Sequence, residues 1–307
     1  MNILVTGGAG FIGSNVADAY LKFGHKVIVV DDLYSGRREN VSNGITFIEM
    51  DIRNNDLNFI FEKYRIEFVN HHAARGDVRG SIERPKEYAD VNITGGINLL
   101  ECSVKNRVKG LIYSSTGGCV YGTAKYFPTD ERHPMQPMDP YGASKASFEI
   151  YLEVYRKLYD FQYTIFRYPN VFGPRQNPLG EAGVISIFAK RMLEGGDVTI
   201  NGDGNQERDY VFVQDVVAAN ILATEKNANC AFNLGTGIGT NVNKIFSVLR
   251  KIIGYKKHPI HVSAKLGEVQ RSILSSEKIY KEWKWKPEVN LYDGLQKTVE
   301  YIKSNEL

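Results

Sequence analysis

Apolar positions in this chain form short continuous runs that alternate with longer segments of helical periodicity. The run Ile3-Leu4-Val5 precedes a glycine-rich turn, a helical pattern from Ser14 to about Phe23, and a second apolar run at 26–30 that ends at Asp31-Asp32. Short apolar runs between turns are typical of buried strands, whereas apolar residues at every third or fourth position are typical of helices. The opening segment therefore predicts a strand–helix–strand unit.

The alternation continues through the first half of the chain. Strands are expected at 46–50, 68–71, 110–113 and 164–167, helices at 95–104 and 139–159, and a loop at 170–175. This order predicts a Rossmann-type doubly wound parallel sheet, whose ligands bind at the carboxyl ends of the strands. After Gly180 the alternation weakens, so we expect a smaller C-terminal α/β substrate lobe. The expected nucleotide-binding domain is 1–167 with about 206–232, and the expected substrate lobe is 168–205 with 233–307.

Composition and charge are those of an ordinary globular protein of 307 residues, with 43% hydrophobic and 24% charged positions. The net charge of +3 and the lack of a long basic run give no support to nucleic-acid binding. Cys102, Cys119 and Cys230 show no disulfide or metal spacing, and the neighbours His71 and His72 would face opposite sides of a strand, so no metal site is expected. Without a secretory signal or a bilayer-spanning run, we expect a cytoplasmic protein with no membrane partner.

The turn after the first strand satisfies a dinucleotide fingerprint, read as Gly8-x-Gly10-x-x-Gly13. Its first glycines permit a tight turn and close approach to a pyrophosphate, the last lets helix and strand pack closely, and the helix N-terminus faces the negative charge. Asp31 is the carboxylate that the fingerprint expects for the ribose hydroxyls, which favours NAD over NADP. Arg37 and Arg38 follow shortly after and weaken that preference.

A second candidate site opens the long helical segment, where Tyr141 and Lys145 are separated by three residues. On a helix this spacing points both side chains the same way, and a neighbouring ammonium favours the ionised phenol by lowering its pKa. The alternative is an ordinary amphipathic helix with one tyrosine and one surface lysine. The same segment carries an aromatic stripe, which we interpret as a packing surface in the core or at a subunit interface. Its members are Phe148, Tyr151, Tyr155 and Tyr159.

Together these motifs carry a family resemblance. The glycine turn, Tyr141-x-x-x-Lys145 and Ser114-Ser115-Thr116 resemble an extended short-chain dehydrogenase/reductase, in which the nucleotide-sugar 4-epimerases are the nearest group. The likeness covers nearly the whole chain. It includes Asp51-Ile52-Arg53, His71-x-Ala73-Ala74, Asn92 before Gly95, Arg167-Tyr168-x-Asn170, Gly173-Pro174-Arg175-Gln176 and Arg208-Asp209-Tyr210.

The resemblance implies roles for particular residues. Tyr141 is the expected acid and base, Lys145 its pKa-lowering partner, and Thr116 the hydroxyl that bonds the reacting sugar oxygen. The residues expected to bind NAD are Gly7, Gly10, Phe11, Ile12, Gly13, Asp31, Asp32, Leu33, Ser35, Gly36, Asp51, Ile52, His72, Ala73, Ala74, Asn92, Tyr141, Lys145 and Tyr168. The residues expected to bind a UDP-sugar are Thr116, Tyr141, Asn170, Val184, Asn201, Arg208, Lys265 and Glu268. The family usually forms a homodimer through the helix that bears the tyrosine and the helix before it.

The implied reaction is NAD-dependent epimerisation of a UDP-hexose at C4 through a transient 4-keto sugar. Glucose, galactose and their N-acetylated forms are the candidate sugars. Thr116 is followed by Gly117-Gly118-Cys119, where the related 4,6-dehydratases carry an acidic residue, so epimerisation is favoured over dehydration. A non-catalytic NAD-binding module is a further alternative, but it would have no need of Thr116, Tyr141 and Lys145 together.

Several positions qualify the family pattern. The segment Lys265-Leu266-Gly267-Glu268 replaces the usual Arg-x-Gly-Asp, and lysine lacks the bidentate fork of arginine on a phosphate. Ser272 is small where a tyrosine in some members excludes N-acetylated sugars, so UDP-N-acetylglucosamine is a candidate substrate. Arg75 and Arg79 lie beside the expected sugar site. They are either exposed surface charges or partners of a sugar carboxylate, in which case UDP-glucuronate is the substrate.

Overall fold

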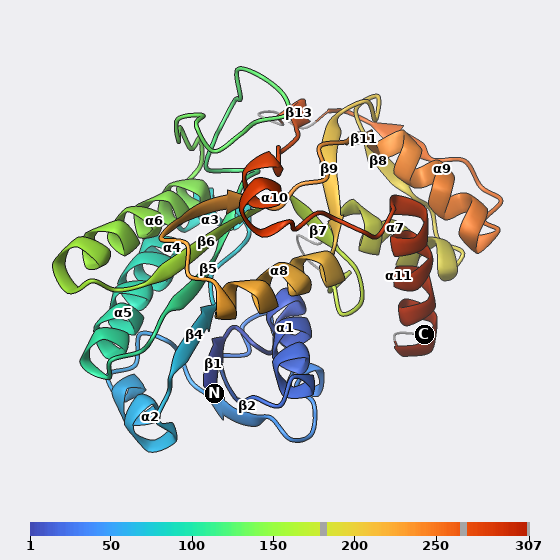
Figure 1. Cartoon of the computed structure of the whole chain (residues 1–307). Coiled ribbons are helices and arrows are strands. Elements are labelled where there is room, and N and C mark those ends of the chain that lie inside the picture. Colours follow the sequence, from blue (N-terminus) through green and yellow to red (C-terminus); the bar gives the residue numbers. More distant parts are fainter. Residues whose placement is uncertain (179–182, 265–268, 306–307) are drawn as a thin grey trace. The chain divides into compact units, whose positions relative to one another are not determined.

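The short apolar runs become a seven-stranded sheet in the computed structural model, which describes residues 1–178, 183–264 and 269–305 (Figure 1). In sheet order the strands are β10 (Cys230–Asn233), β6 (Tyr163–Tyr168), β5 (Leu111–Thr116), β4 (Phe68–His71), β1 (Asn2–Thr6), β2 (Lys26–Asp31) and β3 (Thr46–Glu49). β1 is parallel to both β2 and β4, β2 is parallel to β3, and β4 is parallel to β5. The strand order reverses at β1, which creates a ligand crevice at the carboxyl ends of β1 and β4.

Helices cover the sheet. They are α1 (Phe11–Lys22), α2 (Leu57–Tyr64), α3 (Val78–Glu83), α4 (Pro85–Ala89), α5 (Gly95–Lys105), α6 (Pro140–Tyr159) and α8 (Val213–Glu225), with short helical turns at Arg38–Asn40 and Asp90–Thr94. Ile3, Leu4 and Val5 of β1 are all fully buried, which explains why this strand is a continuous apolar run. Gly96 of α5 allows close packing on α6, because a Cβ there would lie 2.5 Å from the ring of Phe148.

The second part of the chain forms a smaller α/β unit around β9. Its strands are β7 (Asn170–Phe172), β8 (Thr199–Asn201), β9 (Glu207–Phe212), β11 (Gly239–Asn241), β12 (Ile260–Val262) and β13 (Arg271–Ser272), and its helices are α7 (Val184–Leu193), α9 (Val242–Ile253), α10 (Glu277–Trp283) and α11 (Leu291–Asn305). β9 pairs with β7, β11 and β13. The loop expected at 170–175 therefore begins with a strand, because β9 supplies the backbone partners of β7.

Contacts within the chain define two compact units. The first contains Met1–Gly122, Pro134–Arg167 and Val217–Phe232, and the second contains Thr123–His133, Tyr168–Val216 and Asn233–Leu307. Two segments differ from the expected division. Residues 206–216 lie in the second unit because β9 is the centre of its sheet, and residues 123–133 join it because Thr129 exchanges backbone hydrogen bonds with Ile273 and Ser275. Among the helices of the described ranges, none has the length and apolar character that a bilayer crossing requires.

Candidate active site

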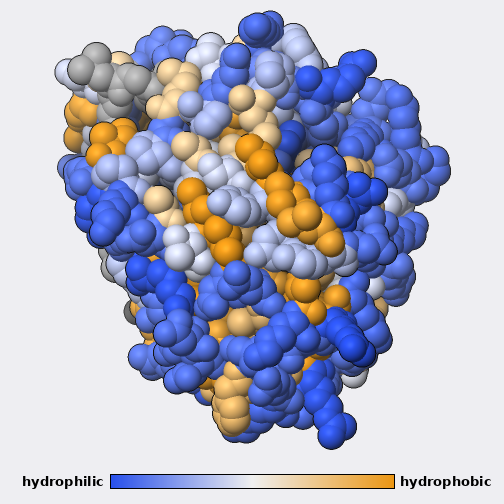
Figure 2. All heavy atoms as spheres, turned by 90° about the vertical axis from the view of Figure 1, so that its left-hand side faces the viewer, coloured by the Kyte–Doolittle hydropathy of each residue, from blue (hydrophilic) through white to orange (hydrophobic). Residues whose placement is uncertain are grey.

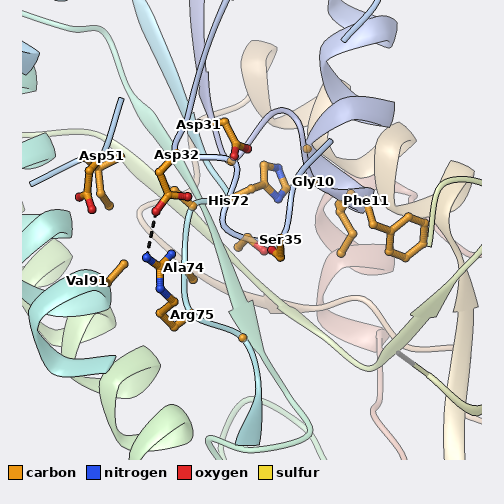
Figure 3. Close-up of a pocket in the computed structure, with 18 of the residues that line it drawn as sticks. Gly10, Phe11, Asp31, Asp32, Ser35, Asp51, His72, Ala74, Arg75 and Val91 are labelled. Carbon is orange, nitrogen blue, oxygen red and sulfur yellow. Dashed lines mark hydrogen bonds and ion pairs between the residues drawn. The ribbon is translucent and has the colours of Figure 1, made fainter. Parts of the chain in front are cut away.

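A cavity of about 350 Å³ opens in the first unit at the carboxyl ends of its strands (Figure 3). This volume suits a small-molecule ligand. The walls are the segments that follow β1, β2, β3 and β4, together with one residue of β5, as the position of the switch point predicts. The lining residues are Gly7, Gly10, Phe11, Ile12, Gly13, Asp31, Asp32, Ser35, Gly36, Met50, Asp51, Ile52, His72, Ala73, Ala74, Arg75, Gly76, Val91 and Ser114.

The turn after β1 has the geometry of a pyrophosphate site. Gly7 adopts a φ of +69°, and a Cβ there would lie 2.5 Å from the backbone nitrogen of Ala73, so both conformation and space restrict this position to glycine. A Cβ on Gly13 would collide with the carbonyl oxygen of Gly7. Gly10 caps α1 without a side chain, so the backbone N–H groups of the first helical turn face the cavity that Gly10 and Phe11 line.

Asp31 ends β2 as a buried carboxylate on the cavity wall. Its Oδ2 accepts the N–H of Ala9 at 2.9 Å, and its Oδ1 accepts the N–H of Leu33 at 2.8 Å. Burial raises the pKa of Asp31, and these two backbone hydrogen bonds oppose the rise. The carboxylate is thus held in one orientation in the cavity, where ribose hydroxyls could donate to its remaining lone pairs.

Asp51 follows β3 and is a second carboxylate in the cavity wall with a shifted pKa. Arg53 donates to both of its oxygens, with the shortest contact at 2.6 Å, and these hydrogen bonds lower the pKa of Asp51. Of the described residues, Arg37 and Arg38 do not line the cavity. The Arg38 guanidinium lies 4.7 Å from the centre of the Phe47 ring.

The cavity brings together most residues expected to bind the cofactor, with five exceptions among those described. The expected residues outside its lining are Leu33, Asn92, Tyr141, Lys145 and Tyr168. Leu33 contributes its backbone N–H to Asp31 instead, and Tyr168 begins a segment of the second unit. The lining residues that sequence reasoning missed are Met50, Arg75, Gly76, Val91 and Ser114.

Asn92 supports the cavity wall from behind rather than lining it. Its Oδ1 accepts the N–H of Arg75 at 2.8 Å, and its Nδ2 donates to the Arg75 carbonyl at 3.1 Å and to the Ser144 hydroxyl at 2.8 Å. The amide is fully buried and is used by these protein partners. The neighbouring Val91 lines the cavity.

Thr116 and Tyr141 meet where β5 ends and α6 begins. Asp139 caps α6 by accepting the N–H of Gly142 at 2.7 Å, and Pro140 occupies the first helical position, so Tyr141 is fixed in the first turn. A hydrogen bond joins the side chains of Tyr141 and Thr116. Burial raises the pKa of Tyr141, and the bond with Thr116 acts in the opposite direction.

Lys145 is buried one helical turn after Tyr141, with only 3% of its surface exposed. Its Nζ lies 4.5 Å from the centre of the Tyr113 ring in β5, a favourable contact for a cation. Burial lowers the pKa of Lys145 from 10.5 to about 7, and the negative charge of Glu149 opposes that fall. Desolvation, reinforced by the positive charge of Lys145, lowers the pKa of His71 well below its ordinary value and that of His72 to about 3.

A buried ion pair behind the reactive residues was missed by sequence reasoning. Glu149 accepts a bidentate pair of hydrogen bonds from Arg167 in β6, on Oε1 at 3.2 Å and on Oε2 at 2.6 Å, and a hydrogen bond from Ser115 at 2.5 Å. Arg167 also donates to the hydroxyl of Tyr121 at 2.8 Å. These contacts tie α6 to β5 at Ser115, next to Thr116, and so fix the helix and the strand that carry the reactive hydroxyls.

The residues expected to bind the UDP-sugar divide between the two units. Thr116 and Tyr141 lie in the first unit. The second unit holds Asn170 in β7, Val184 in α7, Asn201 in β8 and Arg208 in β9. Lys265 and Glu268 lie outside the described residues.

Two positions of the second unit are brought together by its sheet. Arg208 in β9 is paired in register with Ser272 in β13. Ser272, the position at which some family members carry a larger tyrosine, is therefore the strand neighbour of Arg208, one of the residues expected to bind the UDP-sugar.

One of the two interpretations of Arg75 needs correction. Arg75 is buried, so it is no surface charge, and its guanidinium already pairs with Asp32 at 2.9 Å and Glu87 at 3.1 Å. A sugar carboxylate would have to compete with these two carboxylates. Arg79 is exposed, at the start of α3.

Among the residues that the structure describes, no group of three or more acidic, histidine or cysteine side chains could hold a metal ion.

Comparison with known proteins gives consistent matches over the chain. The model of the NAD dependent epimerase/dehydratase family matches residues 3–235. UDP-glucose 4-epimerase of Mycolicibacterium smegmatis is 39% identical over 310 residues, which cover 99% of each chain. The crystal structure of UDP-glucose 4-epimerase of Thermotoga maritima with UDP-glucose has 48% identity and a TM-score of 0.98, with 100% of each chain covered. UDP-glucose 4-epimerase of Thermus thermophilus in complex with NAD has 39% identity and a TM-score of 0.94, covering 99% of this chain and 100% of that one.

Proposed function

Because the chain belongs to the NAD dependent epimerase/dehydratase family, we propose that it inverts C4 of a UDP-hexose with NAD as its cofactor. The observation that carries this proposal is the position of Tyr141 in the first turn of α6, with the buried Lys145 one helical turn away. The sequence-based predictions of the family, its NAD dependence and an epimerase activity are confirmed by the relatives.

The first unit offers a fitting site for NAD. The α1 N-terminus and the glycine turn would bind the pyrophosphate, Asp31 would accept the ribose hydroxyls, and Asp51 with Ile52 would flank the adenine. A Cβ at Gly7 would overlap the wall behind the turn, which shows how closely the backbone is packed around the cavity. When bound, NAD supplies the oxidation of the C4 alcohol and the reverse reduction.

Tyr141 is the proposed acid and base of the reaction. Its phenolate removes the proton of the C4 hydroxyl, and the phenol returns a proton to that oxygen after the keto sugar has turned over. Burial favours the neutral phenol, so the phenolate requires stabilisation by its surroundings. We assign this to the hydrogen bond with Thr116 and to the ammonium of Lys145, which follows at the spacing of one helical turn.

The choice of sugar follows from three local features. No carboxylate follows Thr116, since residues 117–119 are Gly-Gly-Cys, and this supports epimerisation rather than dehydration. Ser272 is small and lies beside Arg208 in register, which supports acceptance of UDP-N-acetylglucosamine as well as UDP-glucose and UDP-galactose. The pairing of Arg75 with Asp32 and Glu87 gives no support to UDP-glucuronate.

We also propose that two copies pair through α6. The expected aromatic stripe is divided, because Phe148 is fully buried in the core whereas Tyr151 and Tyr159 are 38% and 55% exposed. The exposed apolar residues on this helix are Ile150, Tyr151, Val154, Leu158 and Tyr159. Figure 2 looks onto the side of the molecule where α5 and α6 lie in Figure 1, and it shows apolar side chains gathered among polar ones. Exposed apolar side chains gathered on one helix are typical of an interaction surface.

The proposal is tested by incubating the purified protein separately with UDP-galactose, UDP-N-acetylglucosamine and UDP-glucuronate and following C4 inversion by NMR. We expect inversion of the first two. Failure to invert any of the three would refute the proposed function, and a 4-keto-6-deoxy product would identify a dehydratase. Tyr141→Phe is the matched control, because it removes only the phenolic oxygen and should slow inversion by roughly 10²- to 10⁴-fold. If Tyr141→Phe supports the role of the protein in the cell, a non-catalytic module is favoured.

A further inference from the structure

A buried arginine joins two walls of the cofactor cavity. Arg75 follows β4, Asp32 follows β2, and both line the cavity. The Arg75 side chain is 9% exposed, and a terminal guanidinium nitrogen lies 2.9 Å from Asp32 Oδ2, the contact drawn as a dashed line in Figure 3. Its Nε lies 3.1 Å from Oε1 of Glu87 in α4. The forked guanidinium thus holds one carboxylate from each of two separate segments.

Tyr34 and Arg84 close these contacts into a ring. The guanidinium carbon of Arg75 lies 3.7 Å from the centre of the Tyr34 ring. Arg84 donates to the Tyr34 hydroxyl at 3.1 Å and to Oε2 of Glu87 at 2.9 Å. The aromatic ring covers one side of the Arg75 cation, which strengthens its ionic contacts by excluding water from that side. The segment after β2 is joined to the segment from Arg75 to α4 by three of these contacts, those of Arg75 with Asp32 and Tyr34 and that of Arg84 with Tyr34.

The base of the arginine is fixed to the helix that bears Tyr141. Asn92 binds both the N–H and the carbonyl of Arg75, and it also donates to the hydroxyl of Ser144. Ser144 in turn donates to the backbone carbonyl of Tyr141 at 2.8 Å. Both backbone polar groups of Arg75 are thus hydrogen-bonded to Asn92. Any movement of Arg75 is therefore expected in its side chain, at the end that contacts Asp32.

We propose that Arg75 is a clasp at the ribose end of the cofactor cavity, and that release of NAD requires the Arg75–Asp32 contact to open. Asp32 lies next to Asp31, the expected ribose acceptor, so the clasp spans the walls between which the adenosine half of the cofactor would lie. The walls cannot separate while Asp32, Arg75 and Glu87 remain paired. The inference uses the NAD dependence of the family and none of the residues proposed for the sugar.

Nucleotide release from the intact protein tests the clasp. The protein is loaded with NADH, mixed with excess NAD, and the decay of the bound NADH fluorescence gives the release rate. R75Q should release NADH about tenfold faster, because opening no longer breaks a charge-assisted hydrogen bond. E87Q should also accelerate release, by a smaller factor, since Arg75 keeps its contact with Asp32.

The matched control is R132Q, which removes an arginine whose side chain is 89% exposed and paired only at the surface with Asp130. Its release rate should equal that of the wild-type protein. Equal release rates for R75Q and the wild type would overturn the proposal, as would an equal acceleration in R132Q. Circular dichroism verifies the fold of each variant. If R75Q does not fold, E87Q decides, because an unchanged release rate in E87Q also overturns the clasp. No sugar is present, so the outcome is independent of epimerase activity.

Discussion

Replacing Lys145 by methionine is expected to stabilise the folded protein near neutral pH. The Lys145 residue is 3% exposed, and burial lowers the pKa of its amine from 10.5 to about 7. Each pH unit by which the pKa falls corresponds to roughly 1.4 kcal/mol. At pH 7 the folded wild-type protein is therefore less stable, by about 4 kcal/mol, than a variant with a neutral side chain at this position. Methionine has a similar length and no charge, so it should fill the space against Tyr113 without that cost.

The stabilisation has a defined pH dependence. In the unfolded chain the amine keeps its proton up to about pH 10.5, whereas in the folded protein it loses the proton above about pH 7. Because the unfolded state binds more protons between these values, wild-type stability rises with pH across this window. The advantage of methionine should therefore be largest at and below pH 7 and should disappear as pH approaches 10.5.

Thermal unfolding of NAD-free wild-type protein and K145M, from about pH 6 to about pH 10, measures this effect. At about 2–4 °C for each kcal/mol, the melting temperature of K145M should be roughly 10 °C higher at pH 7. Lys157→Met is the matched control on the same helix, since that side chain is 68% exposed, and it should show little change. A K145M protein that melts below the wild type at pH 7, or that differs from it equally at both ends of the pH range, would refute the reasoning.

Three further changes have expected outcomes. Arg167→Met leaves the buried Glu149 carboxylate without its ionic partner and should lower the free energy of unfolding by about 3–5 kcal/mol. A double variant that also replaces Glu149 by leucine should recover most of this loss. Denaturant unfolding of the wild type and the two variants measures both changes. Gly13→Ala places a methyl group against the Gly7 carbonyl and should abolish NAD binding measured by calorimetry, so unchanged affinity would contradict the described packing of the turn. Leu158→Glu puts a charge on the exposed apolar face of α6 and should shift the protein from dimer to monomer in light scattering; a wild-type protein that is already monomeric would contradict the proposed pairing.

The first unit could be predicted from the sequence because its signals are local. A buried parallel strand is a continuous apolar run, and the alternation of such runs with helical periods gives the order of elements directly. The strand Asn170–Phe172 carries no such signal, since three residues show no period and its pairing depends on β9. The place of residues 123–133 was equally hidden, because it follows from the bonds of Thr129 with residues far along the chain.

The same distinction separates the predicted from the missed parts of the site. The glycine turn, Asp31 and the Tyr141–Lys145 spacing are short patterns whose chemistry is contained within them. Arg75 was misinterpreted because its partner Asp32 lies 43 positions away in sequence, which no local pattern reveals. Glu149 was missed for a similar reason. It lies one helical turn after Lys145, a spacing that could have drawn attention to it, but its partner Arg167 comes from a different strand.

The close contact between Gly7 and Ala73 determines how much of the chain must be transferred to move this cofactor site into another protein. The turn that follows β1 is shaped on one side by its own glycines and on the other by the backbone at the end of β4, where His72 donates its N–H to the Thr6 carbonyl at 2.9 Å. The fingerprint and its carboxylate end at Asp31, yet the surface behind the turn is built by residues about forty positions later. An engineer who transplants the opening strand–helix–strand unit into another scaffold would carry the motif without its supporting wall. The smallest transferable piece extends through β4.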